Sequence, residues 1–196
     1  MAVTKKTGTV KATPKKAAPK KSTVKQATSK NVTKKNVKST SLVIKIPKGG
    51  QIIRSFNLTP SLPVDGKATN WLLIDPEQPL RDIDSIGFSF NQESSALEQQ
   101  FERAIVEINI TQNPGNNGIW RFASDGVTVN PDFSDVDHDV VIEITNQGFT
   151  LIAQIQLIGD LPEEIRFGYL AAFTDAVSGA VSVYESQDPD IRVGRP

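Results

Sequence analysis

The sequence predicts an all-β protein: an antiparallel β-sandwich, immunoglobulin-like or jelly-roll-like, preceded by a disordered basic N-terminal tail. From residue 41 onward, short apolar runs are separated by turn residues, and in several runs apolar and polar side chains alternate with period two. Such alternation buries one face of a strand and leaves the other to solvent. Many short strands at this spacing are typical of sandwiches and barrels. The opposite charges of the two parts predict the division: residues 1–40 as the tail and 41–196 as the sandwich domain.

Each element is predicted from its own pattern. The predicted strands, in chain order, are 42–46, 52–58, 71–74, 86–90, 104–110, 119–122, 127–129, 140–144, 149–158, 165–173 and 181–184. Residues that tolerate positive φ connect several of them, at 113–118, 124–126, 146–148 and 178–179. One short helix is expected at 95–103, because Ser95 and Glu98 fit a capping box and Leu97 and Phe101 lie four residues apart on one face. The aromatic residues of the domain are expected in the core rather than on a ligand platform (Trp71, Trp120, Phe88, Phe90 and Tyr169).

The net charge of zero is the sum of two opposite charges. The tail carries twelve lysines and no acidic residue, since the first acidic residue is Asp65. The other 156 residues hold ten Lys and Arg (22 − 12) against all 22 Asp and Glu, so the domain carries −12. The tail also lacks aromatic residues, Leu and Ile, and contains Pro14 and Pro19. Low hydrophobicity with high charge cannot offset the entropy of ordering a chain, so we expect the tail to be disordered.

A lysine-rich tail of this kind is suited to holding a polyanion. Lysine ammonium groups neutralise phosphates and release condensed counterions. No aromatic residue is available for base stacking and no Arg for bidentate recognition of guanine, so we expect little sequence preference. The predicted DNA-binding residues are Lys5, Lys6, Lys11, Lys15, Lys16, Lys20, Lys21, Lys25, Lys30, Lys34, Lys35 and Lys38.

Two stretches of the tail carry a resemblance. The sequences Thr13-Pro14-Lys15-Lys16 and Ala18-Pro19-Lys20-Lys21 resemble the proline-spaced lysine pairs in the tails of linker histones and bacterial histone-like proteins, and residues 22–30 continue that composition. The resemblance implies DNA binding with little sequence preference. Other roles stay open for the tail: a solubilising extension, binding to anionic lipid, or docking on the acidic domain of a neighbouring copy.

The C-terminal segment carries a second resemblance. Asp188-Pro189, an alternating strand and a final proline, in residues 184–196, resemble the closing segments of the DP-EP family of small bacterial β-sandwich proteins. This chain has Arg195-Pro196 where that family has Glu-Pro. The resemblance implies an immunoglobulin-like sandwich and supplies no activity. The Asp-Pro pair by itself is also an ordinary turn before a last strand.

The domain offers weak candidates for metal or catalytic chemistry. Asp135, Asp137 and Asp139 alternate along an extended segment and could supply oxygen ligands to Ca²⁺, but the favoured interpretation is a solvated acidic loop before the strand at Val140. His138, the only histidine, lies between two of these carboxylates and is expected in an exposed loop. There is no Cys, and no local sequence supplies a nucleophile, a base and an orienting group. We therefore expect neither an enzyme nor a cofactor.

The resulting hypothesis is a non-enzymatic binding protein. The tail binds DNA or another polyanion, while the sandwich self-associates or binds a partner; the isolated domain, with its negative charge, is expected not to bind DNA. We expect the chain to form a homo-oligomer and to have no membrane partner. The absence of cysteine fits a reducing compartment, so we expect the protein in the cytoplasm, and associated with the nucleoid if the source is bacterial. The alternative is a structural virion or shell protein with an internal basic arm and a sandwich shell. A carbohydrate- or calcium-binding sandwich with an incidental tail is a third hypothesis.

Overall fold

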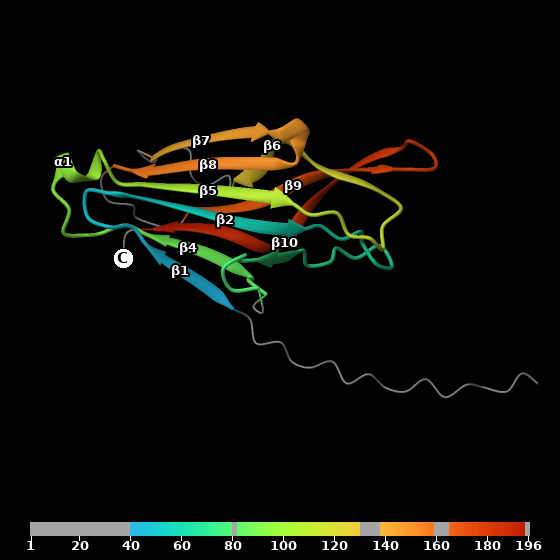
Figure 1. Ribbon diagram of the computed structural model, residues 1–196, viewed down its shortest axis with the longest axis horizontal. Coiled ribbons are helices and arrows are strands. Elements are labelled where there is room, and N and C mark those ends of the chain that lie inside the picture. The colour runs from blue at the N-terminus through green and yellow to red at the C-terminus, as the bar shows by residue number, and fades with distance from the viewer. Residues whose placement is uncertain (1–39, 80–81, 130–137, 159–164, 195–196) are drawn as a thin grey trace, which may run out of the picture. The chain divides into compact units, whose positions relative to one another are not determined.

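The computed structural model describes residues 40–79, 82–129, 138–158 and 165–194 (Figure 1). Their order along the chain is β1 (Ser41–Lys45), β2 (Gln51–Thr59), β3 (Leu72–Ile74), β4 (Ser85–Ser89), α1 (Ala96–Gln99), β5 (Arg103–Ile110), β6 (Gly118–Val129), β7 (His138–Thr145), η1 (Asn146–Gly148), β8 (Thr150–Leu157), β9 (Ile165–Asp175) and β10 (Val181–Gly194). The all-β prediction is confirmed, and each predicted strand overlaps an observed one. The predicted tail lies outside the described residues, apart from Thr40.

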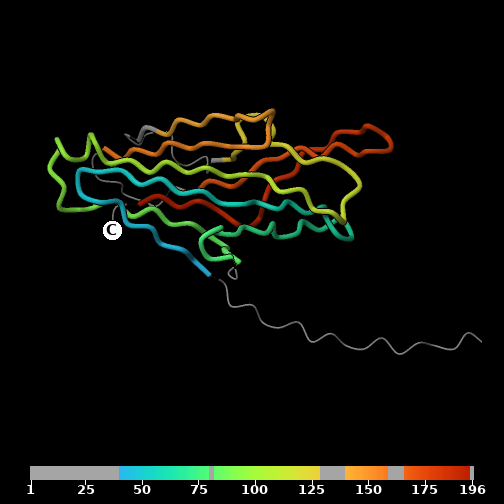
Figure 2. Tube along the Cα trace, viewed as in Figure 1, coloured from blue at the N-terminus to red at the C-terminus, as the bar shows by residue number. Residues whose placement is uncertain are grey.

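The strands form two five-stranded sheets packed as a sandwich. Sheet A has the order β1-β4-β10-β9-β6, and sheet B has the order β3-β2-β5-β8-β7. The predicted antiparallel pairing is only partly correct, because β1 with β4, β4 with β10, and β2 with β5 are parallel. The physical reason is that the chain repeatedly changes sheets between consecutive strands, first between β1 and β2, then between β3 and β4 and between β4 and β5; Figure 2 traces this path. Strands that lie side by side are then often not joined by a hairpin, so nothing requires their directions to be opposed.

The core lies between the two sheets and follows the period-two pattern. In β5, Ala104, Val106, Ile108 and Ile110 are buried, while the residues between them are more exposed. Fully buried large side chains come from both sheets (Ile86, Phe88, Trp120 and Tyr169 from sheet A; Phe56, Leu58, Leu73, Ile108, Leu151, Ile155 and Leu157 from sheet B). Burying these apolar side chains is the dominant favourable contribution to folding.

Two segments predicted as turns are irregularities within long strands. Ser124 and Gly126 have positive φ, as their residue types suggested, but they form a bulge inside β6, where the register to β9 shifts between Phe122 and Val127. Asp188-Pro189, which has a cis peptide bond, is likewise inside β10, whose register to β9 shifts between Glu185 and Asp190. At Ser124 and Gly126 the bulge uses the same positive-φ residues as a tight turn, so sequence alone does not separate the two.

The predicted helix is shorter than expected. The capping box is present: the Glu98 N–H donates to Ser95 Oγ, and the Ser95 N–H donates to Glu98 Oε2. However, α1 ends at Gln99 and β5 begins at Arg103. Leu97 and Phe101 are 67% and 61% exposed, so no apolar helix face is buried there. A short helix gains little without such a face, because most helix stability in proteins comes from packing.

Candidate nucleic-acid interface and carboxylate pocket

Most of the predicted site residues lie outside the described part of the chain. This holds for the twelve lysines and for the calcium candidates Asp135 and Asp137. Asp139 is in β7, in register with Gln156 of β8. Within the described ranges, no group of three or more His, Cys, Asp or Glu side chains is placed to hold a metal ion. None of the helices in those ranges is both long and apolar enough to cross a membrane.

A carboxylate pocket lies where the start of β3, the start of β4 and the bulge of β10 meet. Its volume is about 510 Å³, and it is lined by Asn70, Trp71, Leu72, Leu73, Asp82, Ile83, Asp84, Ser85, Asp188 and Arg192. Backbone hydrogen bonds hold the three segments together: the Trp71 N–H donates to Asp188 O (2.8 Å), and the Asp190 N–H donates to Asp84 O (3.2 Å). The pocket therefore joins residues more than a hundred positions apart in the sequence, which explains why sequence reasoning missed it.

The pocket adjoins the residue at which the described domain begins. The Thr40 N–H donates to Asp84 Oδ2 (2.6 Å), and the Asp84 N–H donates to Thr40 O (3.0 Å). These reciprocal bonds fix Thr40 beside a carboxylate that lines the pocket. Thr40 is the last residue of the lysine-rich tail, and residues 1–39 precede it directly in sequence.

The charge of the pocket is dominated by carboxylates. Burial raises the pKa of Asp188, and the charges of Asp190 and Asp84 raise that pKa further, whereas Arg192 lowers it. The guanidinium of Arg192 is itself engaged, since Nε donates to both carboxylate oxygens of Asp190 at 3.1 and 3.2 Å. An excess of carboxylates favours cations such as an ammonium group and repels phosphates.

The aromatic side chains predicted to lie in the core are buried. Trp71, Trp120 and Tyr169 are 4%, 0% and 0% exposed, and Trp120 packs against Trp71 with ring centroids 5.7 Å apart. Phe88 and Phe90 are also buried. None of these five rings can act as a stacking platform for bases, which needs an accessible ring face.

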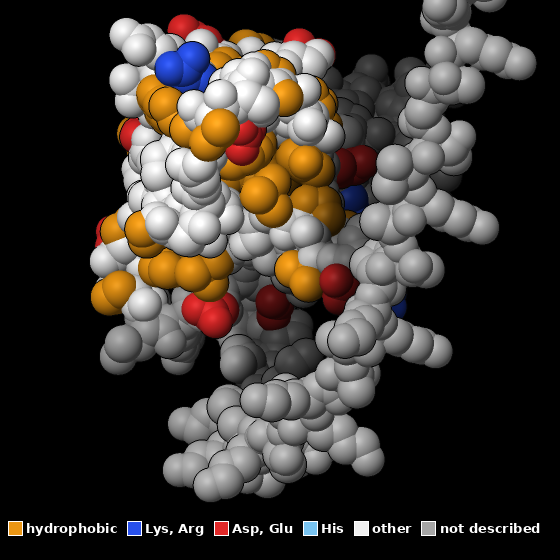
Figure 3. All heavy atoms as spheres, turned by 90° about the vertical axis from the view of Figure 1, so that its right-hand side faces the viewer, with side chains coloured by type: hydrophobic (Ala, Val, Ile, Leu, Met, Phe, Trp, Pro, Cys, Tyr) orange, Lys and Arg blue, Asp and Glu red, His pale blue; other side chains and the backbone are white. Residues whose placement is uncertain are grey.

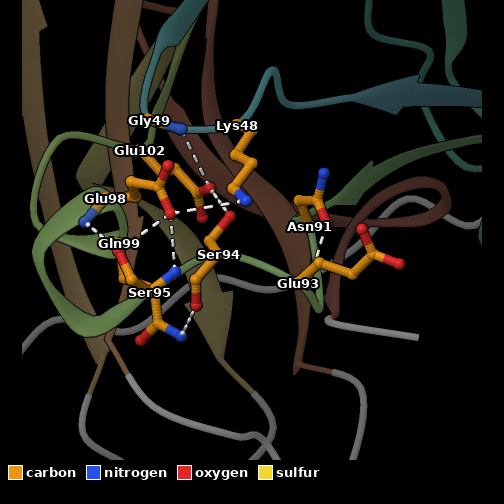
Figure 4. Close-up of polar contacts among 9 residues, drawn as sticks. All are labelled: Lys48, Gly49, Asn91, Glu93, Ser94, Ser95, Glu98, Gln99 and Glu102. Carbon is orange, nitrogen blue, oxygen red and sulfur yellow. Dashed lines mark hydrogen bonds and ion pairs between the residues drawn. The ribbon is translucent and has the colours of Figure 1, made fainter.

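A buried carboxylate stabilises the end of the sandwich near α1 (Figure 4). Glu102 is fully buried and accepts hydrogen bonds from the Ser94 hydroxyl and from the Gly49 N–H. Lys48 forms an ion pair with Glu98 beside it (3.6 Å). Glu102 thus ties the β1–β2 connection to the segment before α1. Its sequence context is that of any exposed acidic residue, so nothing in the pattern signalled its burial.

Comparisons with known proteins agree with the resemblance carried by the C-terminal segment. Residues 13–195 match the DP-EP family, and this match covers the sandwich domain up to residue 195 and most of the tail. No curated protein matches the chain. Because the match extends over more than half of the sequence, the chain belongs to the DP-EP family.

Proposed function

We propose that this chain is a non-enzymatic binding protein whose lysine-rich tail binds DNA or a comparable polyanion without sequence preference, while the sandwich domain self-associates. The observation that carries the proposal is the segregation of charge, with twelve lysines and no acidic residue before Asp65. Each lysine that contacts a phosphate releases a counterion, and this term supplies essentially all of sequence-nonspecific binding to nucleic acid. The number of lysines is therefore more important than their order.

The described domain supports this division of labour because it offers phosphates no comparable surface. Several of its cationic side chains are already paired with carboxylates: Arg54 with Asp75 at 2.6 Å, Arg192 with Asp190, and Lys48 with Glu98. The pocket beside Thr40 is lined by further carboxylates. Paired cations attract phosphates weakly, and the domain's charge of −12 repels DNA. Binding is therefore assigned to the tail.

The test compares full-length variants that change the charge of the tail and nothing in the domain. In one variant all twelve tail lysines are replaced by Gln, and in the matched control all twelve are replaced by Arg. Fluorescence anisotropy with a mixed-sequence duplex measures the affinity, and circular dichroism checks that the domain is unchanged. We expect the Gln variant to lose binding and the Arg variant to retain it. Equal binding by the Gln variant and the wild type would refute the proposal.

Particle size separates this proposal from the shell-protein alternative. A DNA-binding protein of this kind elutes from size exclusion as a small oligomer. A discrete multi-megadalton species would favour a shell protein, in which the basic arm neutralises a packaged genome.

A further inference from the structure

We propose that two copies of this chain associate through the outer face of sheet A at the tip of the β9–β10 hairpin. This surface, called the hairpin face, is formed by two cross-strand rows. The first row is Ile119, Thr174 and Val181, and the second is Arg121, Ala172 and Val183. The proposal deepens the proposed function, because it names the surface for the self-association included there.

The hairpin face is apolar where a solvent-facing sheet surface is normally polar. Ile119, Val181 and Val183 are 46%, 63% and 56% exposed, and Val177 in the hairpin turn is 83% exposed. On β6 the neighbouring Trp120 is buried, so Ile119 lies on the outer face of sheet A, whereas residues 180–183 are all exposed and form the projecting tip of the hairpin. Figure 3 shows hydrophobic side chains gathered at the end of the domain that lies at the right of Figure 1, where the hairpin projects. Contiguous exposed apolar patches of this kind mark interaction sites.

The charges indicate that the occupant is a second copy. No carboxylate belongs to either row, and the one charged side chain, Arg121, lies over the Phe149 ring at 5.2 Å. A surface whose one cation lies over an aromatic ring attracts phosphates weakly. A surface without carboxylates likewise attracts a lysine-rich segment weakly. The sandwich domains, considered without their tails, each carry −12, so they approach one another most easily at a face without carboxylates. A two-fold axis through the hairpin face brings identical apolar side chains together.

The adjacent strand edge is protected, so the contact is face to face rather than edge to edge. β6 is an edge strand of sheet A. At Trp120, the Gln112 side chain replaces a neighbouring strand: the Trp120 N–H donates to Gln112 Oε1 (2.9 Å), and Gln112 Nε2 donates to Trp120 O (3.0 Å). Blocking an edge in this way prevents strand addition. The side chains of the hairpin face are left to make the contact.

The test uses two substitutions on the same sheet face that differ only in location. Val183→Glu places a carboxylate in the hairpin face. Val43→Glu is the matched control, because Val43 also points outward from sheet A and is 60% exposed, but lies on β1 at the opposite edge. Sedimentation velocity of the full-length chain over a concentration series measures the dimer dissociation constant, and thermal unfolding checks the fold. A double Val181→Thr, Val183→Thr variant, nearly isosteric, replaces the Glu variant if the latter does not fold.

We expect a wild-type dimer, a dissociation constant raised about tenfold or more by Val183→Glu, and no change with Val43→Glu. A monomeric wild type, or equal effects of the two substitutions, would overturn the proposal. Failure here is distinguishable from failure of the proposed function. A monomer that still binds DNA leaves the role of the tail intact, whereas a dimer without DNA binding removes that role and keeps the hairpin face.

Discussion

Replacing Gly118 by Ala tests the pairing of β6 with β9 on which the hairpin face depends. A Cβ at Gly118 would lie 2.3 Å from Phe173 Cζ and 2.3 Å from Thr174 O, whereas real Cβ contacts are essentially never shorter than 3.0 Å. One of the two strands must therefore move by at least 0.7 Å (3.0 − 2.3). Thr174 O is a backbone atom, so the movement disturbs the β6–β9 ladder. Overpacking of this kind typically costs about 1–3 kcal/mol.

Gly87→Ala provides the matched control, because Gly87 is also a strand residue of sheet A. The nearest atom to its added Cβ is Val43 Cγ2 at 3.6 Å, an ordinary van der Waals contact. Without strain, a Gly-to-Ala change stabilises by about 0.4–1 kcal/mol, because it reduces the entropy of the unfolded chain. The two substitutions are therefore expected to have opposite signs and to differ by about 1.5–4 kcal/mol.

Equilibrium unfolding in urea, followed by the fluorescence of the buried tryptophans, measures both changes. Equal effects on the free energy of unfolding, or a neutral Gly118→Ala, would show that the Phe173 ring does not cover Gly118. The described register between β6 and β9 would then be wrong.

Two further predictions concern charges of the domain. Arg54→Met removes the cationic partner of Asp75, whose side chain is 2% exposed. Leaving that carboxylate without its cation should lower the free energy of unfolding in urea by about 1.5–3 kcal/mol. The control Lys48→Met, at an exposed ion pair, should cause no resolvable change. Comparable losses from the two variants would contradict this reasoning. The second prediction follows from the raised pKa of Asp188, which means that folding favours the protonated form of this carboxyl group. The stability that the protonated carboxyl contributes is fully present below pH 3.8 and is lost as the pH rises through the pKa of Asp188 in the folded state. Asp188→Asn should therefore have a larger free energy of unfolding than the wild type at pH 7, and this difference should shrink as the pH approaches 3.8. A difference in stability that does not change with pH would exclude the titration of Asp188 as its cause.

The strands of this domain could be predicted because burial of one face leaves a period-two record in the sequence. β5 is the clearest case, with every second residue from Ala104 to Ile110 buried. The choice of sheet leaves no such record, because a strand that alternates in sheet A looks the same as one in sheet B. The parallel pairing of β2 with β5 therefore had to come from the structure.

The candidate sites divide in the same way. The lysine-rich tail is visible in the sequence because its signal is composition, which needs no fold to be recognised. The carboxylate pocket and the hairpin face are not visible, because each combines residues from separate strands. Asp84 and Asp188 meet only through the pairing of β4 with β10, and Ile119 meets Val181 only across β9.

The salt dependence of DNA affinity for the full-length chain tests the central claim most directly. If about half of the twelve lysines contact phosphates, the logarithm of the affinity should fall with the logarithm of salt concentration with a slope of about −5. The twelve-Arg variant should give a similar slope, since the slope reports the number of neutralised phosphates rather than the kind of cation. A flat salt response of the wild type would contradict the assignment of DNA binding to the tail.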